Sequence, residues 1–362
     1  MSESQKVVKV GSRSSELAMI QTNYIINRLK DLHPHLRFEI QSMDTKGDKV
    51  LDKALPKIGE KSLFTAELEH ALKDETIDFA VHSLKDLPTI LPEGLVLGAV
   101  CKREDARDIV LVNEKYKGKT LKQLPDKSVI GTSSLRRTAQ LCRNYPQLVV
   151  ENIRGNLNTR LRKLTCEDSQ YAAIVLASAG VHRLGWSSKI NEVLNEEDML
   201  FAVGQGALAV ECRENDSETL TLLEALHDYE TVNCVIAERS FLRKLEGGCS
   251  APVGVHSRFH DDTIEFVGGV WSLDGKDELK IKDKFCLNSI QPSSEDSGEP
   301  KTKVIHLDRK TFAGISSGSY CISKLAAVEK FGEDVANSLI LQGALEIMAI
   351  AKDNIKKSMS TS

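Results

Sequence analysis

The sequence is poor in aromatic residues and in long apolar runs. Phe, Trp and Tyr make up 5% of its 362 residues. No apolar run approaches the roughly 18 residues that a membrane-spanning helix needs. The start of the chain, MSESQKVVKV, lacks the apolar core of a secretory signal peptide. We therefore expect a cytoplasmic protein that has no membrane as a partner.

Paired cysteines are also missing. The eight cysteines are scattered, and no two form the CxxC pair that zinc sites and redox centres use. They stand at positions 101, 142, 166, 212, 234, 249, 286 and 321. Single cysteines of this kind are typical of a reducing compartment. We expect neither disulfides nor a bound metal.

Charge of one sign is not in large excess. The 48 Lys and Arg residues face 52 Asp and Glu, which gives a net charge of −4. A protein that grips nucleic-acid phosphates is usually strongly basic, so nucleic acid is not an expected partner. The hydrophobic fraction of 41% and the charged fraction of 28% are those of a folded globular protein. The length predicts roughly two or three domains.

Short strand-like segments alternate with helical periodicity over the first two thirds of the chain. The segment 172–177, AAIVLA, is apolar throughout, as a strand covered on both faces is. The alternation predicts α/β layers with a largely parallel sheet. The predicted strands are 7–10, 38–40, 79–81, 129–131, 149–150 and 172–177, and the predicted helices are 17–29 and 63–72.

The last third has a different pattern. Strands predicted at 265–270 and 279–285 flank a hairpin turn at 273–276. Helices are predicted at 323–331 and 334–352, so this part of the chain reads as a separate α+β domain. The segment 288–303 is rich in Ser, Pro, Glu and Gly, which predicts an exposed mobile loop.

A basic stretch lies in the middle of the chain. Between residues 130 and 164, seven basic side chains face one acidic residue, Glu151, so this stretch carries +6. Most of the basic residues are arginines, which bind carboxylate or phosphate through a planar fork. A solvated helix face explains most charge runs, but the surrounding turns favour an anion site. The seven are Arg136, Arg137, Arg143, Arg154, Arg160, Arg162 and Lys163.

The first of these turns is VIGTSSLRR, residues 129–137. A strand runs into a glycine turn, and Ser133 or Ser134 would cap the helix that follows. Arg136 and Arg137 then fall in the first helical turn, where cations oppose the helix dipole unless an anion is bound. Strand, glycine turn, cap and arginine together predict an anion site.

Two further corners repeat this arrangement. The segment 153–160, IRGNLNTR, places glycine, asparagine caps and arginine after a strand, and 11–15, GSRSS, contributes Arg13 and Ser15. The bound anion could be a nucleic acid, a nucleotide or a polycarboxylate. No aromatic residues interleave with the arginines as base-stacking platforms would, and no GxxxxGK[ST] phosphate loop is present. A polycarboxylate therefore fits at least as well as the other two.

The segment 79–88, FAVHSLKDLP, is a strand that ends in a polar turn. Ligands bind beyond the carboxyl ends of strands in open α/β sheets. Beside an arginine-lined site, Asp86 is a candidate general acid and base or cation stabiliser. His82 reads as a structural residue. A triad of Ser83, His82 and Asp86 is disfavoured because neighbours on a strand point to opposite faces.

Cys249 stands in the glycine turn LEGGCSAP, residues 245–252. Two glycines allow such a loop to approach another surface closely. Taken alone, the residues leave open whether this thiol is reactive or inert. A protease nucleophile would need a partner histidine, and nothing marks His256, the nearest one, as a base.

Seven segments, taken in order, resemble the porphobilinogen deaminase (hydroxymethylbilane synthase) family of haem and tetrapyrrole biosynthesis. The match is collinear from about residue 7 to residue 352. Ser12 and Glu16 depart from the Thr and Gln that are common in the family, and Glu16 places a negative charge near Arg13. The segments are 11–13 with Ser15, 61–65 (KSLFT), 82–88, 131–137, 153–160, 204–208 (GQGAL) and 246–250 (EGGCS).

The resemblance implies an α/β fold of two lobes, similar to periplasmic binding proteins, that flank a cleft. A third, α+β domain follows. Lobe 1 would comprise 1–100 and 201–226, lobe 2 would comprise 101–200, and the C-terminal domain 227–362 would carry the cofactor cysteine. A mobile lid is implied at 43–63, with Lys61 near its end.

The resemblance also implies a transferase reaction. Cys249 would bear a dipyrromethane through a thioether, built from the enzyme's own substrate and never turned over. Four porphobilinogens would be added head to tail on this primer, each with release of ammonia, and hydrolysis would free hydroxymethylbilane for uroporphyrinogen-III synthase. Asp86 would protonate the leaving amine, stabilise the azafulvene-type cation and help remove the pyrrole α-proton.

Each pyrrole ring carries an acetate and a propionate, so about twelve carboxylates would crowd the site at full extension and repel one another without fixed cations.

The implied protein is a monomer. The alternatives are a two-lobed anion-binding protein without catalysis and a nucleic-acid binder. The resemblance assigns the cofactor to Ser83, Lys85, Thr132, Ser133, Arg136, Arg137, Gly155, Arg160, Arg183 and Gln205, and the substrate to Arg13, Ser15, Arg154 and Arg160.

Overall fold

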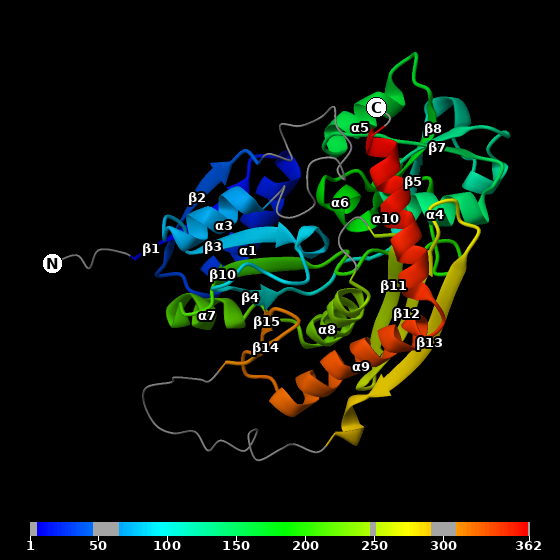
Figure 1. Ribbon diagram of the computed structural model, residues 1–362. Helices are drawn as coiled ribbons and strands as arrows, with labels where there is room; N and C mark the ends of the chain where they lie inside the picture. Colours follow the sequence, from blue (N-terminus) through cyan, green and yellow to red (C-terminus); the bar gives the residue numbers. More distant parts are fainter. Residues whose placement is uncertain (1–5, 46–64, 247–250, 291–308, 361–362) are drawn as a thin grey trace.

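The computed structural model describes residues 6–45, 65–246, 251–290 and 309–360. These residues form two mixed β-sheets, each with helices, and a third antiparallel sheet that packs on helices (Figure 1). The α/β class of the first part and the α+β character of the last part are confirmed.

The first sheet has seven strands in the order β14-β15-β4-β10-β3-β1-β2. Its face that contains Phe79 and Val81 packs against α1 and α7, and its face that contains Ala80 packs against α3. Alternation along one strand thus puts helices on both faces. The elements are β1 (Val7–Arg13), α1 (Glu16–Leu32), β2 (Arg37–Met43), α3 (Ala66–Lys73), β3 (Phe79–Ser83), β4 (Leu95–Val100), β10 (Leu208–Arg213), α7 (Ser217–Glu224), β14 (Thr311–Phe312) and β15 (Ile315–Ser316).

The second sheet has five strands in the order β7-β6-β8-β5-β9. All seven residues of its central strand β8 are buried, which confirms the prediction from its apolar sequence. The chain enters this sheet after β4 and returns from it to β10. The elements are β5 (Asp108–Val112), β6 (Val129–Gly131), α4 (Leu135–Asn144), β7 (Val149–Glu151), α5 (Leu157–Thr165), β8 (Tyr171–Ala177), α6 (Ser178–Arg183) and β9 (Glu192–Val193).

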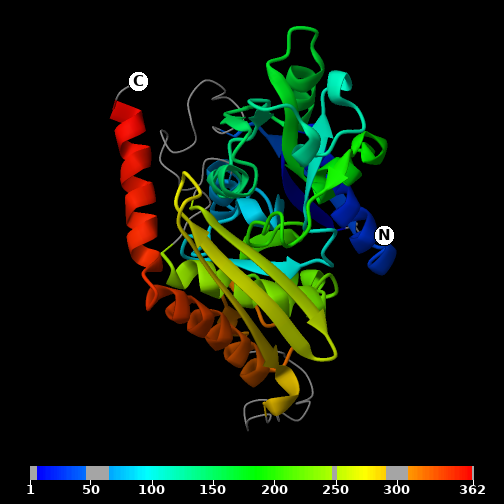
Figure 2. The same ribbon diagram turned by 90° about the vertical axis from the view of Figure 1, so that its right-hand side faces the viewer.

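The third sheet is an antiparallel meander packed on α8 and α9 (Figure 2). The predicted hairpin turn joins β12 to β13, with Gly275 at a φ of 74°. The elements are α8 (Tyr229–Lys244), β11 (Val253–His260), β12 (Thr263–Trp271), β13 (Glu278–Cys286), α9 (Ile322–Ile340) and α10 (Ala344–Ser360).

The prediction of a largely parallel sheet is wrong. Strand β10 runs antiparallel to β3 and β4, and β5 runs antiparallel to β8 and β9. Each of these two strands is reached directly from the other sheet. Parallel neighbours need a crossover connection within one sheet, and β5 and β10 have none.

The predicted boundary between the last two helices is also wrong. Helix α9 runs through Gly332 to Ile340, and the chain turns at Gly343, which has a φ of 98°. A Cβ on Gly332 would lie 2.3 Å from the backbone oxygen of Ala237 in α8. This glycine therefore allows two helices to approach closely and does not end one.

The division into two lobes and a C-terminal domain remains a prediction. Strands β14 and β15 lie in 227–362 by sequence, yet β15 pairs with β4 of the first sheet. Of the predicted lid 43–63, residues 46–63 lie outside the described residues, as do residues 291–303 of the predicted loop 288–303. In the described part of the chain no single helix is long and apolar enough to span a membrane, and α9 and α10 meet that test only as a pair bent by 79°.

Candidate active site

Asp86 lies in a tight turn at the carboxyl end of β3. A single 3-10 turn, Leu84–Asp86, follows the strand, and the amide of Leu84 donates to the backbone oxygen of Ala207 at 3.0 Å. Leu84 and Leu87 are buried, whereas Asp86 is exposed. The two leucines therefore anchor the turn and leave the carboxylate of Asp86 outside the core. His82 is buried, 3.0 Å from Glu211 Oε2, as expected for a structural residue.

Arg136 and Arg137 begin helix α4, after β6 and its glycine. Ser134 caps the helix by accepting from the amide of Arg137 at 3.5 Å, which settles the choice between the two serines. Both arginines are buried, with 4% and 5% of their surface exposed. The solvated-face interpretation is therefore wrong for this pair.

Asp108, which the sequence analysis missed, holds this arginine pair. Its Oδ2 accepts from Arg136 Nη1 and its Oδ1 from Arg137 Nη2, both at 2.8 Å. Burial alone would raise the pKa of Asp108, but the two arginines outweigh burial and hold that pKa well below its usual range. The one available sequence signal was an acidic residue at the start of an apolar strand.

Lys85 lies between the two sheets. Its Nζ is 3.4 Å from Oε1 of Gln205. Its pKa is lowered to about 8, with burial as the largest cause. Arg137 and Arg136 lower it further, whereas Asp86 and Asp108 oppose the change. The turn of the first sheet and the arginine pair of the second are thus close enough to influence each other electrostatically.

Arg160 joins the same group of charges. Asn156 caps α5 by accepting from the amide of Thr159 at 2.9 Å, and Arg160 Nε donates to the backbone oxygen of Gly155 at 2.9 Å. The pKa of Arg160 is lowered to about 10, first by burial and then by Arg137 and Arg154, against the opposing effect of Asp86. Gly155 has a φ of 109°, a conformation that favours glycine.

The remaining predicted hydroxyl groups are engaged within the protein. Ser15 caps α1 by accepting from the amide of Ala18 at 3.4 Å. Ser133 donates to the backbone oxygen of Ile153, and Thr132 accepts from the amide of Ser134 at 3.2 Å. These contacts hold the turns that present the arginines. Ser83 accepts from Gln21 Nε2 at 3.0 Å, a partner that the sequence analysis missed.

Arg13 ends β1, next to β3 in a parallel arrangement, so Arg13 and Asp86 lie at the same edge of the first sheet. Arg183 donates to the backbone oxygen of Gly206 at 2.9 Å, and its pKa is lowered, chiefly by burial. Cys249 and Lys61 lie outside the described residues, and their assignments remain predictions. No group of three or more His, Cys, Asp and Glu suited to a metal ion occurs in the part of the chain that the structure describes.

The donors in this region suit a polyanion such as dipyrromethane. Buried Nε atoms of Arg136 and Arg137 have no acceptor among the described residues. Lys85, Arg160 and Arg183 all have lowered pKa values because burial disfavours their charged forms. Acetate and propionate groups would supply both the acceptors and the opposite charge.

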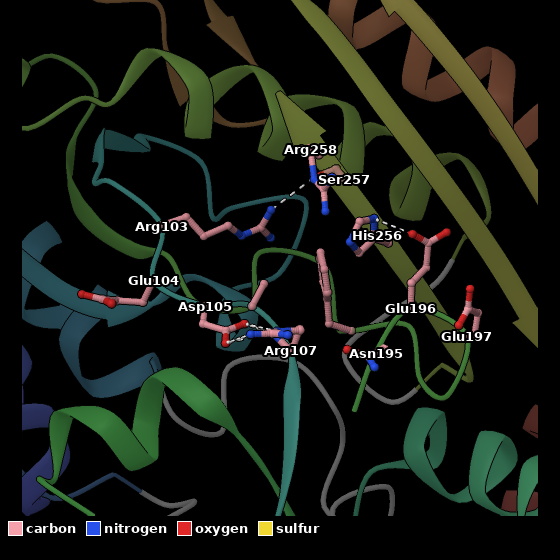
Figure 3. A pocket seen from close by; sticks show the side chains of 12 residues that line it. Arg103, Glu104, Asp105, Arg107, Asn195, Glu196, Glu197, His256, Ser257 and Arg258 are labelled. Carbon is pink, nitrogen blue, oxygen red and sulfur yellow. Dashed lines mark hydrogen bonds and ion pairs between the residues drawn. The ribbon is translucent and has the colours of Figure 1, made fainter. Parts of the chain in front are cut away.

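A separate pocket lies where the two segments that connect the sheets, around residues 103–107 and 195–201, meet β11 (Figure 3). Three of its basic side chains have carboxylate partners within the protein. Arg107 pairs with Asp105 at 2.8 Å, and His256 lies 3.4 Å from Glu196. Arg103 binds Glu238 at 2.6 Å. This pocket therefore differs from the arginine site, whose cations outnumber their carboxylate partners.

Comparison with known proteins identifies the family. Residues 8–221 match the family described as "Porphobilinogen deaminase, dipyromethane cofactor binding domain", and residues 232–296 match "Porphobilinogen deaminase, C-terminal domain". The chain belongs to the porphobilinogen deaminase family. This result confirms the resemblance, and the first match confirms dipyrromethane as the family's cofactor.

Curated porphobilinogen deaminases are similar along most of the chain. The protein of Nostoc sp. is 48% identical over 280 residues, which cover 77% of this chain and 86% of that one. The protein of Gloeobacter violaceus is 53% identical over 273 residues, which cover 75% and 83%. Their names are those of enzymes in the family that the sequence motifs indicated.

Solved structures with a partial likeness belong to other proteins. The BenM effector binding domain with benzoate has a TM-score of 0.38 at 15% identity, covering 62% of this chain and 91% of that one. The methionine binding protein MetQ has a TM-score of 0.38 at 16% identity, covering 61% and 89%.

Proposed function

We propose that this member of the porphobilinogen deaminase family condenses four porphobilinogens on a dipyrromethane cofactor, with Asp86 as acid and base. The observation that carries the assignment is the exposed carboxylate of Asp86 beside three cations, the half-buried Lys85 and Arg160 and the buried Arg137. Cations suit the carboxylates of substrate and cofactor, and a carboxylate suits the positive charge that develops when the amine leaves.

The cations would bind and orient the pyrrole chain. Arg136, Arg137, Arg160 and Lys85 would hold its acetate and propionate groups, as would Arg183. Gly155 would shape the turn before α5. Arg13 and Arg154 would hold the incoming porphobilinogen, with Ser15 at the same corner. Fixed cations hold the chain in place without the cost of reorganising solvent around it.

When bound, the dipyrromethane supplies the pyrrole carbon to which the next ring is joined. Asp86 would pass a proton to the leaving amine of porphobilinogen and stabilise the positive charge left on the methylene carbon. It would then accept the α-proton of the pyrrole that has formed the new carbon–carbon bond. Each addition therefore returns Asp86 to its starting state and releases one ammonia.

The test of Asp86 compares Asp86→Asn with the matched variant Asp126→Asn, an exposed aspartate of the second sheet's loops. We expect Asp86→Asn to keep its cofactor by intact mass and to lose nearly all porphobilinogen consumption. Asp126→Asn should retain both. Near-normal turnover by Asp86→Asn would remove this residue from the mechanism.

Attachment of the cofactor at Cys249 is tested by intact mass under denaturing conditions. The native protein should carry an excess of two porphobilinogen-derived pyrrole units, and Cys249→Ala should not. No excess in either protein after incubation with porphobilinogen would leave a binding protein that has kept the fold without the chemistry.

Three further assignments belong to this proposal and rest on the family alone. We propose a monomer, a cytoplasmic location, and transfer of hydroxymethylbilane to uroporphyrinogen-III synthase. A molar mass of one chain by light scattering would support the first of these, and a mass of two chains would contradict it.

A further inference from the structure

Gln205 lies where the chain returns from the second sheet to the first. It stands between two glycines with positive φ values, 72° at Gly204 and 92° at Gly206. A Cβ on Gly204 would lie 2.8 Å from Leu84 of the Leu84–Asp86 turn, and a Cβ on Gly206 would lie 2.5 Å from the backbone oxygen of Glu104. Because both neighbours are closely packed, Gln205 is fixed between this turn and the segment that leads from the first sheet to the second.

The backbone of Gln205 is held as well. Arg103 donates its Nε–H to the Gln205 carbonyl at 2.8 Å and pairs with Glu238 of α8 at 2.6 and 2.8 Å. The same arginine points toward Ser257 of β11, 3.2 Å away (Figure 3). The position of Gln205 is therefore tied to α8 and to β11 of the third sheet.

The side chain of Gln205 joins the two sheets. Its Nε2 donates to Asp108 Oδ1 at 2.8 Å and to the backbone oxygen of Ala106 at 2.6 Å. Its Oε1 accepts from Lys85 Nζ at 3.4 Å. Both N–H groups of the amide thus have acceptors within the protein, and the residue is fully buried. This arrangement differs from the cofactor contact expected from the sequence.

Asp108 completes the connection. It is fully buried, and its Oδ1 accepts from Gln205 and Arg137 while its Oδ2 accepts from Arg136. Three donors around one buried carboxylate leave it little freedom to move. A continuous series of contacts therefore runs from Lys85 through Gln205 and Asp108 to the arginine pair.

We propose that Gln205 and Asp108 are positioning residues that hold the arginine pair of the second sheet in register with Lys85 and Asp86 of the first. The inference rests on the proposed function of this site. Neither residue needs to touch the substrate. Their role is to keep the cations that bind the growing chain at a set distance from the acid and base, and a misplacement of about 1 Å can cost roughly a hundredfold in rate.

The test uses Gln205→Met, which keeps the length of the side chain and removes its contacts with Lys85 and Asp108. We expect kcat for porphobilinogen consumption to fall at least about tenfold with KM within about threefold, because the substrate residues Arg13 and Arg154 are untouched. Intact mass should still show the cofactor. Asp108→Asn, an isosteric change, should give the same pattern and serves if Gln205→Met does not fold.

A matched control is Asn113→Leu. Asn113 is a buried amide directly after β5, at the opposite end of that strand from Asp108, and it donates to the backbone oxygen of Leu164 at 2.7 Å. This variant should lose stability and keep the native kcat. If it loses kcat as Gln205→Met does, the loss reflects general destabilisation and the positioning role is wrong.

The double variant Gln205→Met with Asp108→Asn gives a second readout. If Gln205 and Asp108 act through the same series of contacts, the double variant should lose no more kcat than the worse single variant. If they act independently, the two fold-losses in kcat should multiply. Multiplied losses, or a kcat for Gln205→Met within twofold of native, would overturn the proposal. A native protein that fails to consume porphobilinogen would instead overturn the proposed function.

Discussion

Asn158 donates a hydrogen bond to the Glu16 carboxylate at 2.5 Å and so joins the amino-terminal ends of α5 and α1. The two helices pack on different sheets and lie far apart in sequence. A Cβ on Gly180 of α6 would touch Leu157 at 3.0 Å and Leu17 at 3.6 Å, so α6 lies between them at this point. The contact connects the corner of Arg13 with the corner of Arg160.

Glu16 stands three residues after Arg13, at a position where the resemblance drawn from the sequence predicts Gln. Glu16→Gln keeps an oxygen for Asn158 and removes the negative charge. We expect KM for porphobilinogen, a dicarboxylate, to fall about twofold because repulsion near Arg13 is reduced, an effect that salt screens. Steady-state kinetics at low and high salt will measure it.

Asn158→Ala is the control for that change because it removes the contact and keeps the charge. It should leave the salt dependence of KM as in the native protein. A Glu16→Gln variant whose KM equals the native value at low salt would contradict the electrostatic role of Glu16.

The pKa of Lys85 is lowered to about 8 from 10.5 in the unfolded chain. This change predicts that protein stability and carboxylate binding vary with pH in opposite directions. Between these values the unfolded chain binds more protons than the folded one, so Lys85 makes the free energy of unfolding rise with pH. Over the same window the folded protein loses a cation and should bind carboxylates more weakly. Both effects should be measured in the cofactor-free Cys249→Ala background.

The comparison is between that protein and the same protein with Lys85→Met. The difference in their free energies of unfolding, from denaturant titrations, should change between pH 8 and 10.5 and be flat well below pH 8. In the cofactor-loaded native protein the window should move to higher pH because the carboxylates stabilise the charged amine. A flat difference throughout would mean that the pKa of Lys85 is not lowered.

Arg136 and Arg143 lie two turns apart on α4 and should differ in function. Arg136 is buried against Asp108, whereas Arg143 donates to the backbone oxygens of Gly275 and Lys276 at 3.1 Å. Arg136→Ala should reduce the fraction of protein carrying the cofactor about tenfold, because it removes a buried guanidinium that would bind a carboxylate of the cofactor. Arg143→Ala should loosen the contact with the β12–β13 turn and leave cofactor loading unchanged.

Intact mass after incubation with porphobilinogen gives the loaded fraction for both variants. Equal loading of Arg136→Ala and Arg143→Ala would refute the assignment of Arg136 to the cofactor. A fall in the melting temperature of Arg143→Ala, without a change in loading, is the result expected for a contact that only joins two parts of the fold.

Gly332 should resist a substitution that helix propensity favours. Propensity alone predicts that Gly332→Ala stabilises α9 by about 1 kcal/mol. The added Cβ would lie 2.3 Å from the Ala237 backbone oxygen, so we expect a net loss of about 1–3 kcal/mol from overpacking. Denaturant unfolding at constant m-value will give the difference.

Ala326→Gly, at an exposed position of the same helix, isolates propensity without packing and should cost about 1 kcal/mol. If Gly332→Ala gains what Ala326→Gly loses, the close approach of α8 and α9 does not constrain position 332.

The sequence by itself determined the features that depend on neighbours along the chain. It predicted a serine cap before α4 and an asparagine cap before α5, and Ser134 and Asn156 accept from amides three residues on. It also predicted the burial of β8 from an apolar sequence. The ordered motifs identified the family, and the excess of arginine indicated an anionic ligand. Short-range hydrogen bonds and hydrophobic pattern suffice for such conclusions.

Only the tertiary structure decided how these parts meet. Gln205 and Asp108 are 97 residues apart, and Lys85 and Gln205 are 120 apart, so no local pattern relates them. Strands β5 and β10 are antiparallel to their neighbours because the chain reaches each of them from the other sheet. Gly332 predicts a helix end from the sequence, and only its contact with α8 explains why the helix continues. Strand direction, close packing and the pairing of buried charges are set by residues distant in sequence, because they arise only when separate elements are packed together.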